Sequence, residues 1–122
     1  ISMVDIRDVA EVSANVLTTE GHESQTYVLT GPATVSMNDL AGALSTALGK
    51  QVNYVNVPIA ATRESLIGMG LSDWMADTFC EYFENHSNGG SNFLSDDVEK
   101  ITGHPPIGIE RFAQDFAPYF SG

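Results

Sequence analysis

Apolar residues recur every three or four positions along most of this chain, a spacing that places them on one face of an α-helix. A first helix is expected from about Asp5 to Thr18, because Ile6, Val9 and Val16 share a face and Asp5 is a natural N-cap. The same spacing predicts further helices over residues 36–49, 59–70, 72–86, 95–103 and 109–120.

Local capping signals support these helices. Ser36 is the expected N-cap of the second helix, and Asp39 stands three positions later, as in a capping box. Ser72 and Ser95 are the expected N-caps of two later helices. Pro118 is expected to fray the last helix, because proline lacks the amide proton that an internal helical turn uses.

Three short segments have a different composition, rich in β-branched and aromatic residues, and predict strands. They are "ISMV" at residues 1–4, "QTYVLTG" at 25–31 and "QVNYVNVP" at 51–58. Strands separated by helices favour parallel pairing, because the chain needs a long crossover to return in the same direction. We therefore expect one α/β domain over residues 1–122, with few, short, mainly parallel strands in the order strand-helix-strand-helix-strand, followed by a helical cluster.

Composition and charge narrow the possible partners. The chain has 16 acidic and 5 basic residues, a formal charge of −11, and this charge repels nucleic acid and anionic membrane surfaces. No apolar run approaches the roughly 18–20 residues of a membrane span, so a soluble cytoplasmic protein is expected. The single cysteine, Cys80, lies in an apolar helix pattern and is interpreted as a small buried hydrophobe, with a reactive thiol as the alternative.

The motifs of common catalytic sites are missing from the sequence. His22, His86 and His104 lie far apart, without the close spacing of zinc ligands. No glycine-rich loop opens a helix, no tyrosine is followed four residues later by lysine, and no serine lies in a G-x-S-x-G elbow. Many acidic residues fall in the first turns of helices, where capping and the helix dipole explain them. We therefore assign no catalytic, cofactor-binding or metal-binding residue.

The region from Met69 to Phe83 is the most aromatic part of the chain. Met75, Phe79 and Phe83 recur at helical spacing on one face, and Trp74 and Met69 lie beside them in the same cluster. Such a stripe is more often a helix face buried in a core, and the alternative is that it lines an apolar ligand pocket. The sequence leaves these two interpretations open.

Several longer segments resemble the C-terminal part of NmrA-like proteins, which are atypical members of the extended short-chain dehydrogenase/reductase superfamily. The resemblance covers nearly all 122 residues, and its most specific pieces are "VDIRDVA", the run from "YVLTGP" to "VNVP", and "DDVEKITGHPP". Some family members are NAD(P)H-dependent quinone or dye reductases, and others are redox-sensing regulators. The resemblance implies that this chain is the substrate-binding lobe of such a protein.

The resemblance also implies what the chain lacks. In the family an N-terminal Rossmann half carries a GxxGxxG loop and binds the dinucleotide, so NAD(P)H is expected only together with that half. The substrate would then face the segments after Asp5, after Val57 and around Met69 to Phe79. The implied pocket, for a small aromatic or quinone-like ligand, consists of Pro58, Met69, Trp74, Met75 and Phe79.

Two functional hypotheses follow from these expectations. In the first, the chain is the substrate-binding portion of an NmrA-like reductase or redox sensor, a fragment without its Rossmann half; the absence of an initiator methionine motivates this interpretation. In the second, it is a stand-alone, non-catalytic binding or assembly module whose uncovered surface is buried in a homodimer. The expected partners are accordingly the missing half or a second copy of the chain.

Overall fold

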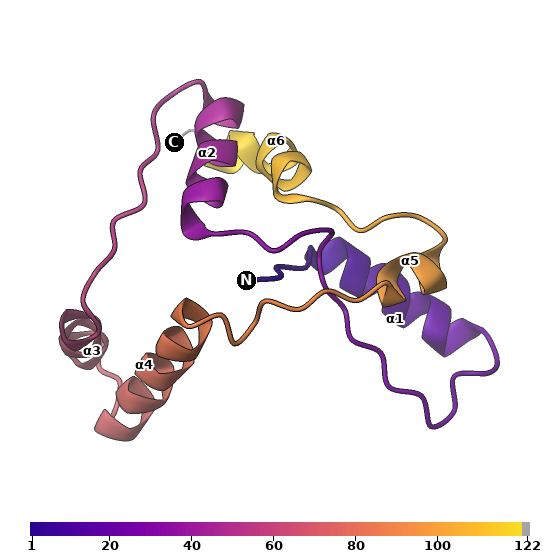
Figure 1. The fold of residues 1–122 in the computed structure, drawn as a ribbon, viewed down its shortest axis with the longest axis horizontal. Helices are drawn as coiled ribbons and strands as arrows, with labels where there is room; N and C mark the ends of the chain where they lie inside the picture. The colour runs from indigo at the N-terminus through magenta and orange to yellow at the C-terminus, as the bar shows by residue number, and fades with distance from the viewer. Residues whose placement is uncertain (121–122) are drawn as a thin grey trace.

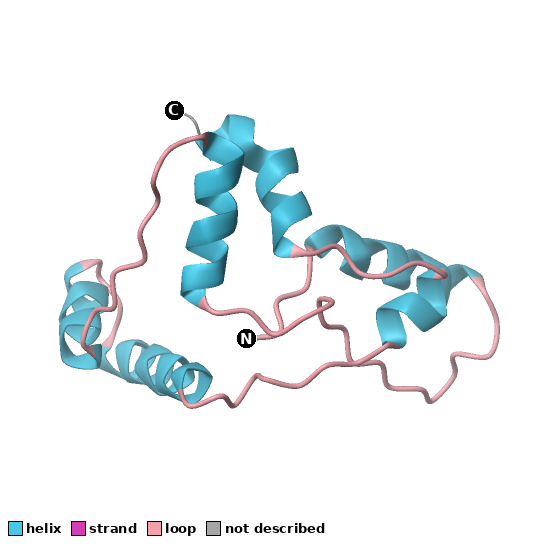
Figure 2. Cartoon of the chain, turned by 45° about the horizontal axis from the view of Figure 1, so that its top comes forward, coloured by secondary structure: helices cyan, strands magenta, loops and turns pink. Residues whose placement is uncertain are grey.

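The computed structural model describes residues 1–120, and within that range it consists of helices joined by loops (Figure 1; Figure 2). The helices are α1 (Ile6–Thr18), α2 (Met37–Leu48), α3 (Ile59–Gly68), α4 (Asp73–Ser87), α5 (Asp97–Thr102) and α6 (Ile109–Phe120). All six predicted helices are therefore confirmed, with bounds within a few residues of those expected.

The predicted N-caps of the three longer early helices are also confirmed. The Asp5 side chain accepts a hydrogen bond from the Arg7 amide at 2.9 Å. Ser36 and Asp39 form a complete capping box at the start of α2. Ser72 accepts from the Met75 amide at 3.3 Å at the start of α4.

Two finer expectations about helix ends were wrong. The N-cap of α5 is Asp96, and the preceding Ser95 instead accepts a hydrogen bond from the amide of Asp97 at 3.1 Å. The last helix continues through Pro118 to Phe120, so the proline does not end it. The first difference shifts the cap by one residue, and in the second the helix extends two residues beyond the proline.

The expected α/β fold is wrong, because none of the three predicted strands forms a ladder within residues 1–120. Ile1 and Val35 exchange one pair of backbone hydrogen bonds, of 2.8 and 2.9 Å, but this pairing does not continue. The segment around Val28 bonds side chains instead, since its amide donates to a carboxylate oxygen of Asp97 at 2.8 Å. Strand-forming residues favour an extended backbone, but a sheet also needs a second extended segment in register, which these segments do not find.

The helix backbones approach one another closely in three pairs, α1 with α5, α2 with α6 and α3 with α4 (Figure 1). The buried apolar positions are few and mostly small: Val12, Ala41, Ala76, Cys80, Val98 and Ala113. The burial of Cys80 confirms its interpretation as a small buried hydrophobe. Because the pairs are joined mainly by extended loops, they leave open space between them.

None of the helices in the described part of the chain has the length and hydropathy needed to cross a membrane.

Candidate functional site

An open hollow of about 1410 Å³ lies between the start of α2, the extended segment 54–58 and the end of α4. Figure 1 shows these three elements on different sides of the molecule's left half. The lining of the hollow includes residues of all three elements: Met37, Asp39, Tyr54, Val55, Asn56, Val57, Pro58, Ile59, Tyr82, Phe83, Glu84 and His86. A concave site with apolar and aromatic walls and a few polar groups is the usual form of a small-molecule site.

The aromatic wall of the hollow comes from the last turns of α4. Tyr82 and Phe83 are neighbours in the helix, and their rings meet edge to face with centroids 5.9 Å apart. The His86 ring lies one turn further on, with its centroid 3.9 Å from that of Tyr82. Both Tyr82 and Phe83 are substantially exposed, at 56% and 40%. A flat ligand in the hollow could therefore stack against them without displacing core residues.

The opposite wall is formed by the extended segment before α3. Val55 and Val57 expose apolar side chains, and the Tyr54 hydroxyl donates to the Asn56 side-chain oxygen at 3.3 Å. Pro58 ends this segment and is the N-cap residue of α3. The segment thus offers apolar contact area together with hydroxyl and amide groups that can bond a polar ligand atom.

Carboxylates supply the ionised side chains of the lining. Asp39 accepts from both the backbone amide and the hydroxyl of Ser36, each at 2.7 Å, and these bonds hold the pKa of Asp39 below its ordinary value. Glu84 is the second carboxylate, and no lysine or arginine lies in the lining. Ile1 also lines the hollow, and its α-amino group donates to the Val35 carbonyl and to the Asn92 side-chain oxygen.

The structure separates the residues that were predicted to form the substrate pocket. Pro58 lines the hollow, whereas Met69, Trp74, Met75 and Phe79 are outside its lining. Phe79 contacts the wall indirectly, because its ring stacks on that of Phe83 with centroids 6.2 Å apart.

The remaining three residues lie around the start of α4, and the aromatic stripe does not form a closed core there. Met69 and Trp74 are 74% and 75% exposed, and Met75 is 43% exposed. The side chains that are buried on α4 are instead the small ones of Ala76 and Cys80. The larger residues therefore form an exposed surface on the α3–α4 hairpin.

Sequence reasoning missed the polar part of this site. Asp39 was interpreted only as a capping residue. Its place in the first turn of α2 also puts it in the lining of the hollow. Glu84 carried no signal, because its role depends on the segment 54–58, which is distant in the sequence. The alternation in "VNYVNVP" was the one available signal, since it leads to Tyr54 and Asn56.

A second group of charged residues joins α1 to α6, away from the hollow. The Arg7 guanidinium donates to Asp5 at 2.8 and 2.9 Å and to Asp115 at 2.7 Å, and it lies 5.3 Å from the centroid of the Phe116 ring. These bonds lower the pKa of the Asp5 carboxyl, whose side chain is only 3% exposed. Asp115 also bonds Arg111 at 2.8 Å. Every member has a charged partner, so the group is a structural ion-pair network.

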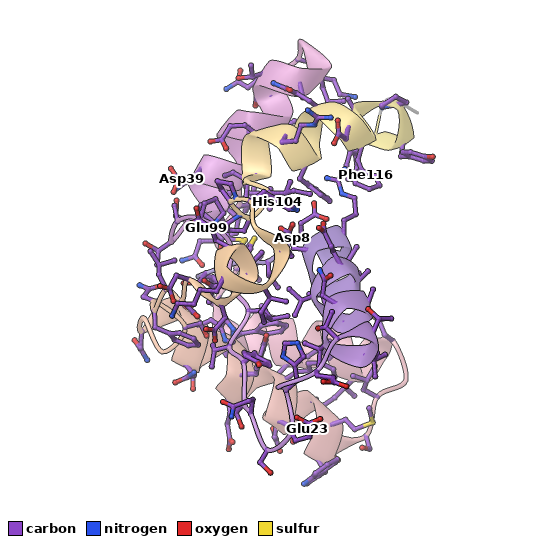
Figure 3. The ribbon with its side chains drawn as sticks, turned by 90° about the vertical axis from the view of Figure 1, so that its right-hand side faces the viewer. Asp8, Glu23, Asp39, Glu99, His104 and Phe116 are labelled. Carbon is purple, nitrogen blue, oxygen red and sulfur yellow. The ribbon has the colours of Figure 1, made fainter. Side chains whose placement is uncertain are left out.

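A third polar group lies where α1 meets the segment before α6, and Figure 3 shows Asp8 and His104 on this side of the molecule. Buried Asp8 accepts from the Ile107 amide at 2.7 Å, and Glu11 lies 2.9 Å from the His104 ring. The hydrogen bonds of the His104 ring, to the Pro105 carbonyl and to Glu11, raise its pKa. Within residues 1–120 no three histidine, cysteine or acidic side chains are arranged to hold a metal ion.

Known proteins resemble this chain closely. Residues 1–112 match the family described as the NmrA-like family. The NAD(P)H azoreductase of Xenophilus azovorans is 35% identical over 120 residues, which cover 98% of this chain and 42% of that protein. Quinone oxidoreductase 2 of Escherichia coli (strain K12) is 35% identical over 98 residues, which cover 80% of this chain and 34% of that protein.

Solved structures agree with this relationship. An NADPH-dependent quinone oxidoreductase from Escherichia coli superposes with a TM-score of 0.79 at 30% identity, over 95% of this chain and 42% of that one. The triphenylmethane reductase of Citrobacter sp. superposes with a TM-score of 0.77 at 26% identity, over 96% of this chain and 40% of that one. The chain thus spans about two fifths of the length of these relatives, and through the match over residues 1–112 it belongs to the NmrA-like family.

Proposed function

We propose that this chain is the substrate-binding portion of an NmrA-like NAD(P)H-dependent reductase, and that its hollow receives a small aromatic or quinone-like acceptor. The observation that carries the proposal is the open hollow with an aromatic wall, in a chain that corresponds to two fifths of proteins named as azo and quinone reductases. In this proposal the remaining part of the reductase supplies the cofactor site.

The lining suits a flat acceptor with one or two carbonyl oxygens. Tyr82 and Phe83 offer ring faces and edges to a planar ligand, and Val55 and Val57 offer apolar contact on the other side. The Asn56 side-chain NH₂ group can donate to a carbonyl oxygen, and the Tyr54 hydroxyl can do so once it gives up its bond to the Asn56 side-chain oxygen. Binding here would position the acceptor, and hydride transfer to it needs the nicotinamide that the rest of the protein would hold.

No residue of this chain is proposed to bind the dinucleotide. Its sequence has no GxxGxxG loop, and the helix starts beside the hollow follow "TVS" and "NVP" rather than glycine-rich turns. We expect that titration of the 122-residue chain with NADPH gives no change in nucleotide fluorescence. Saturable binding would overturn this assignment.

Binding of 1,4-naphthoquinone to the 122-residue chain, measured by equilibrium dialysis, tests the proposed site. Replacing Phe83 by alanine removes part of the aromatic wall, and we expect binding to weaken at least fivefold, or ~1 kcal/mol. The matched control is Phe93→Ala, because Phe93 is 54% exposed and lies outside the lining. Equal loss in both variants, or no binding by the unmodified chain, would contradict the proposal.

One observation favours the second candidate function, a homodimeric binding or assembly module. Met69, Trp74 and Val55 are each at least 73% exposed, and large apolar side chains left in solvent are available for association with a partner. This alternative predicts a dimer in sedimentation equilibrium that Trp74→Glu converts to a monomer. A monomer at micromolar concentration in the unmodified chain would exclude it.

A further inference from the structure

We propose that Asn88 is a site of spontaneous deamidation, a covalent modification that loosens the end of α4. Asn88 is the C-cap residue of α4, and Gly89 follows it directly. In the reaction the Gly89 amide nitrogen attacks the side-chain carbon Cγ of Asn88. The N–Cγ bond forms, the bond from Cγ to the side-chain nitrogen breaks, and that nitrogen leaves as ammonia together with the Gly89 amide proton. Water then opens the cyclic imide on one side or the other, which gives isoaspartate or aspartate.

The residue after an asparagine controls how closely the backbone nitrogen can approach Cγ. Gly89 has no Cβ to obstruct this approach, and its φ of 84° lies in the left-handed region that favours glycine. Asn88 is exposed, and within residues 1–120 its side chain has no hydrogen-bond partner. The side-chain amide therefore reacts without first leaving a packed or bonded position.

The attacking amide is held only by a short turn. The Gly89 amide donates to the His86 carbonyl at 3.1 Å, and the Gly89 carbonyl accepts from the Asn92 amide at 3.0 Å. Backbone bonds in an exposed turn at a helix end open by local fraying, without unfolding of the core. Such an opening is sufficient for the attack, because Asn88 lies at the end of α4 and not inside it.

The other asparagines lack this combination of neighbour and position. One group lies inside helices, where the helical bonds hold the backbone: Asn15, Asn38 and Asn85. The members of the other group precede a bulky residue, and their side-chain oxygens accept hydrogen bonds: Asn53, Asn56 and Asn92. Asn88 is thus the position at which the reactive sequence and an unbonded, exposed side chain coincide.

Deamidation alters the end of α4 in two ways. The new carboxylate meets the negative end of the helix dipole, and Glu84 stands one turn before it with the same charge. In isoaspartate the Cβ atom becomes part of the main chain, so the turn gains a backbone atom and its hydrogen bonds lose their register. Because the Ser2 amide donates to the Ser91 carbonyl at 3.0 Å, this change also reaches the N-terminal segment.

Incubation of the folded 122-residue chain at mildly alkaline pH tests the site. Trypsin releases residues 64–100 as one peptide, and electron-transfer fragmentation distinguishes its asparagines and tells isoaspartate from aspartate. We expect a mass increase of one dalton at Asn88, with isoaspartate in excess. Asn88→Gln should abolish this increase, because the longer side chain closes a less favourable ring. The matched control, Asn53→Gln, should leave it unchanged.

Two results would overturn the assignment. One is modification that occurs at Asn85 or Asn92 and not at Asn88. The other is an unmodified folded chain under conditions in which the urea-unfolded chain reacts at Asn88, because the turn would then protect the site.

Asn88→Asp separates the effect of charge from the effect of the longer backbone, since it carries the carboxylate on a normal main chain. We expect this variant to melt roughly 1–4 °C below the unmodified chain. The isolated isoaspartate form should melt lower still, and its amide hydrogens over residues 84–92 should exchange faster. Identical exchange in the modified and unmodified chains would show that the end of α4 is not loosened.

Discussion

Replacing Gly31 by alanine tests how the N-terminal segment is held against the rest of the chain. Gly31 is buried and does not need a positive φ, so the effect of a side chain there is purely steric. An added Cβ would overlap the Met3 carbonyl oxygen and lie 3.2 Å from the Met3 carbonyl carbon. Both contacting atoms belong to backbone, which cannot rotate away as a flexible side chain would.

The neighbouring contacts limit how far Gly31 can shift. Thr30 is 2% exposed, and its hydroxyl accepts from the Ser95 amide at 3.0 Å. Relief of the overlap must therefore move residues 1–4 or break the contact to Ser95. Overpacking of this kind typically costs ~1–3 kcal/mol, and for a domain near this size each kcal/mol lowers the melting temperature by roughly 4 °C.

Gly42 offers a matched control with the opposite expected sign. It lies inside α2, and an added Cβ there meets nothing within 4 Å. Alanine at an unobstructed helical position stabilises by about 0.5–1 kcal/mol relative to glycine. Thermal unfolding followed by circular dichroism at 222 nm should thus show Gly31→Ala melting roughly 4–12 °C below and Gly42→Ala a few degrees above the unmodified chain. Equal melting temperatures for Gly31→Ala and the unmodified chain would refute the packing of Gly31 on Met3.

Two further predictions concern pH. Because Arg7 lowers the pKa of Asp5, its stabilisation is present above the ordinary carboxyl pKa of about 3.9 and is lost as pH falls through the lower folded value. Arg7→Met should therefore melt below the unmodified chain at pH 7, with the two curves converging under acid; a gap that stays constant with pH would contradict this. The pKa of His104 is raised by the hydrogen bonds of its ring, so its stabilisation is present below about pH 6.5 and is lost as pH rises through the higher folded value. NMR titration should find the His104 ring pKa closer to its ordinary value in Glu11→Gln, and an unchanged titration would remove Glu11 as a cause.

The helices could be predicted from the sequence because their signals are local. The capping box of Ser36 and Asp39 and the cap at Ser72 involve residues only three positions apart, so the sequence contains both partners of each bond. Periodicity then supplied the extent of each helix. The strands could not be predicted in the same way, because residues 25–31 and 51–58 show extended propensity but the sequence does not say whether a pairing segment exists.

The candidate site was predictable only in part. Pro58 was named because the family resemblance implied that the segment after Val57 faces the substrate, and in the structure it lines the hollow. Trp74 and Met75 were chosen by aromatic and apolar spacing, which identifies a helix face but not the element opposite it. Asp39 and Glu84 line the same hollow although they lie in helices about 45 positions apart in the sequence, and nothing in their local sequence indicates this shared lining.

The pairing of the helices also dictates an order of folding. Among the packed pairs, only α3 and α4 are consecutive in the sequence. The partner of α1 is α5 and the partner of α2 is α6, so each pair forms only after the later helix has been synthesised. During synthesis the α3–α4 hairpin can form first, but α2 has no partner until Ile109–Phe120 has been made. α1 can pair once α5 has been made, whereas α2 stays unpaired until the last helix emerges, so a nascent chain that stops before Ile109 should expose the apolar face of α2 to chaperones and proteases.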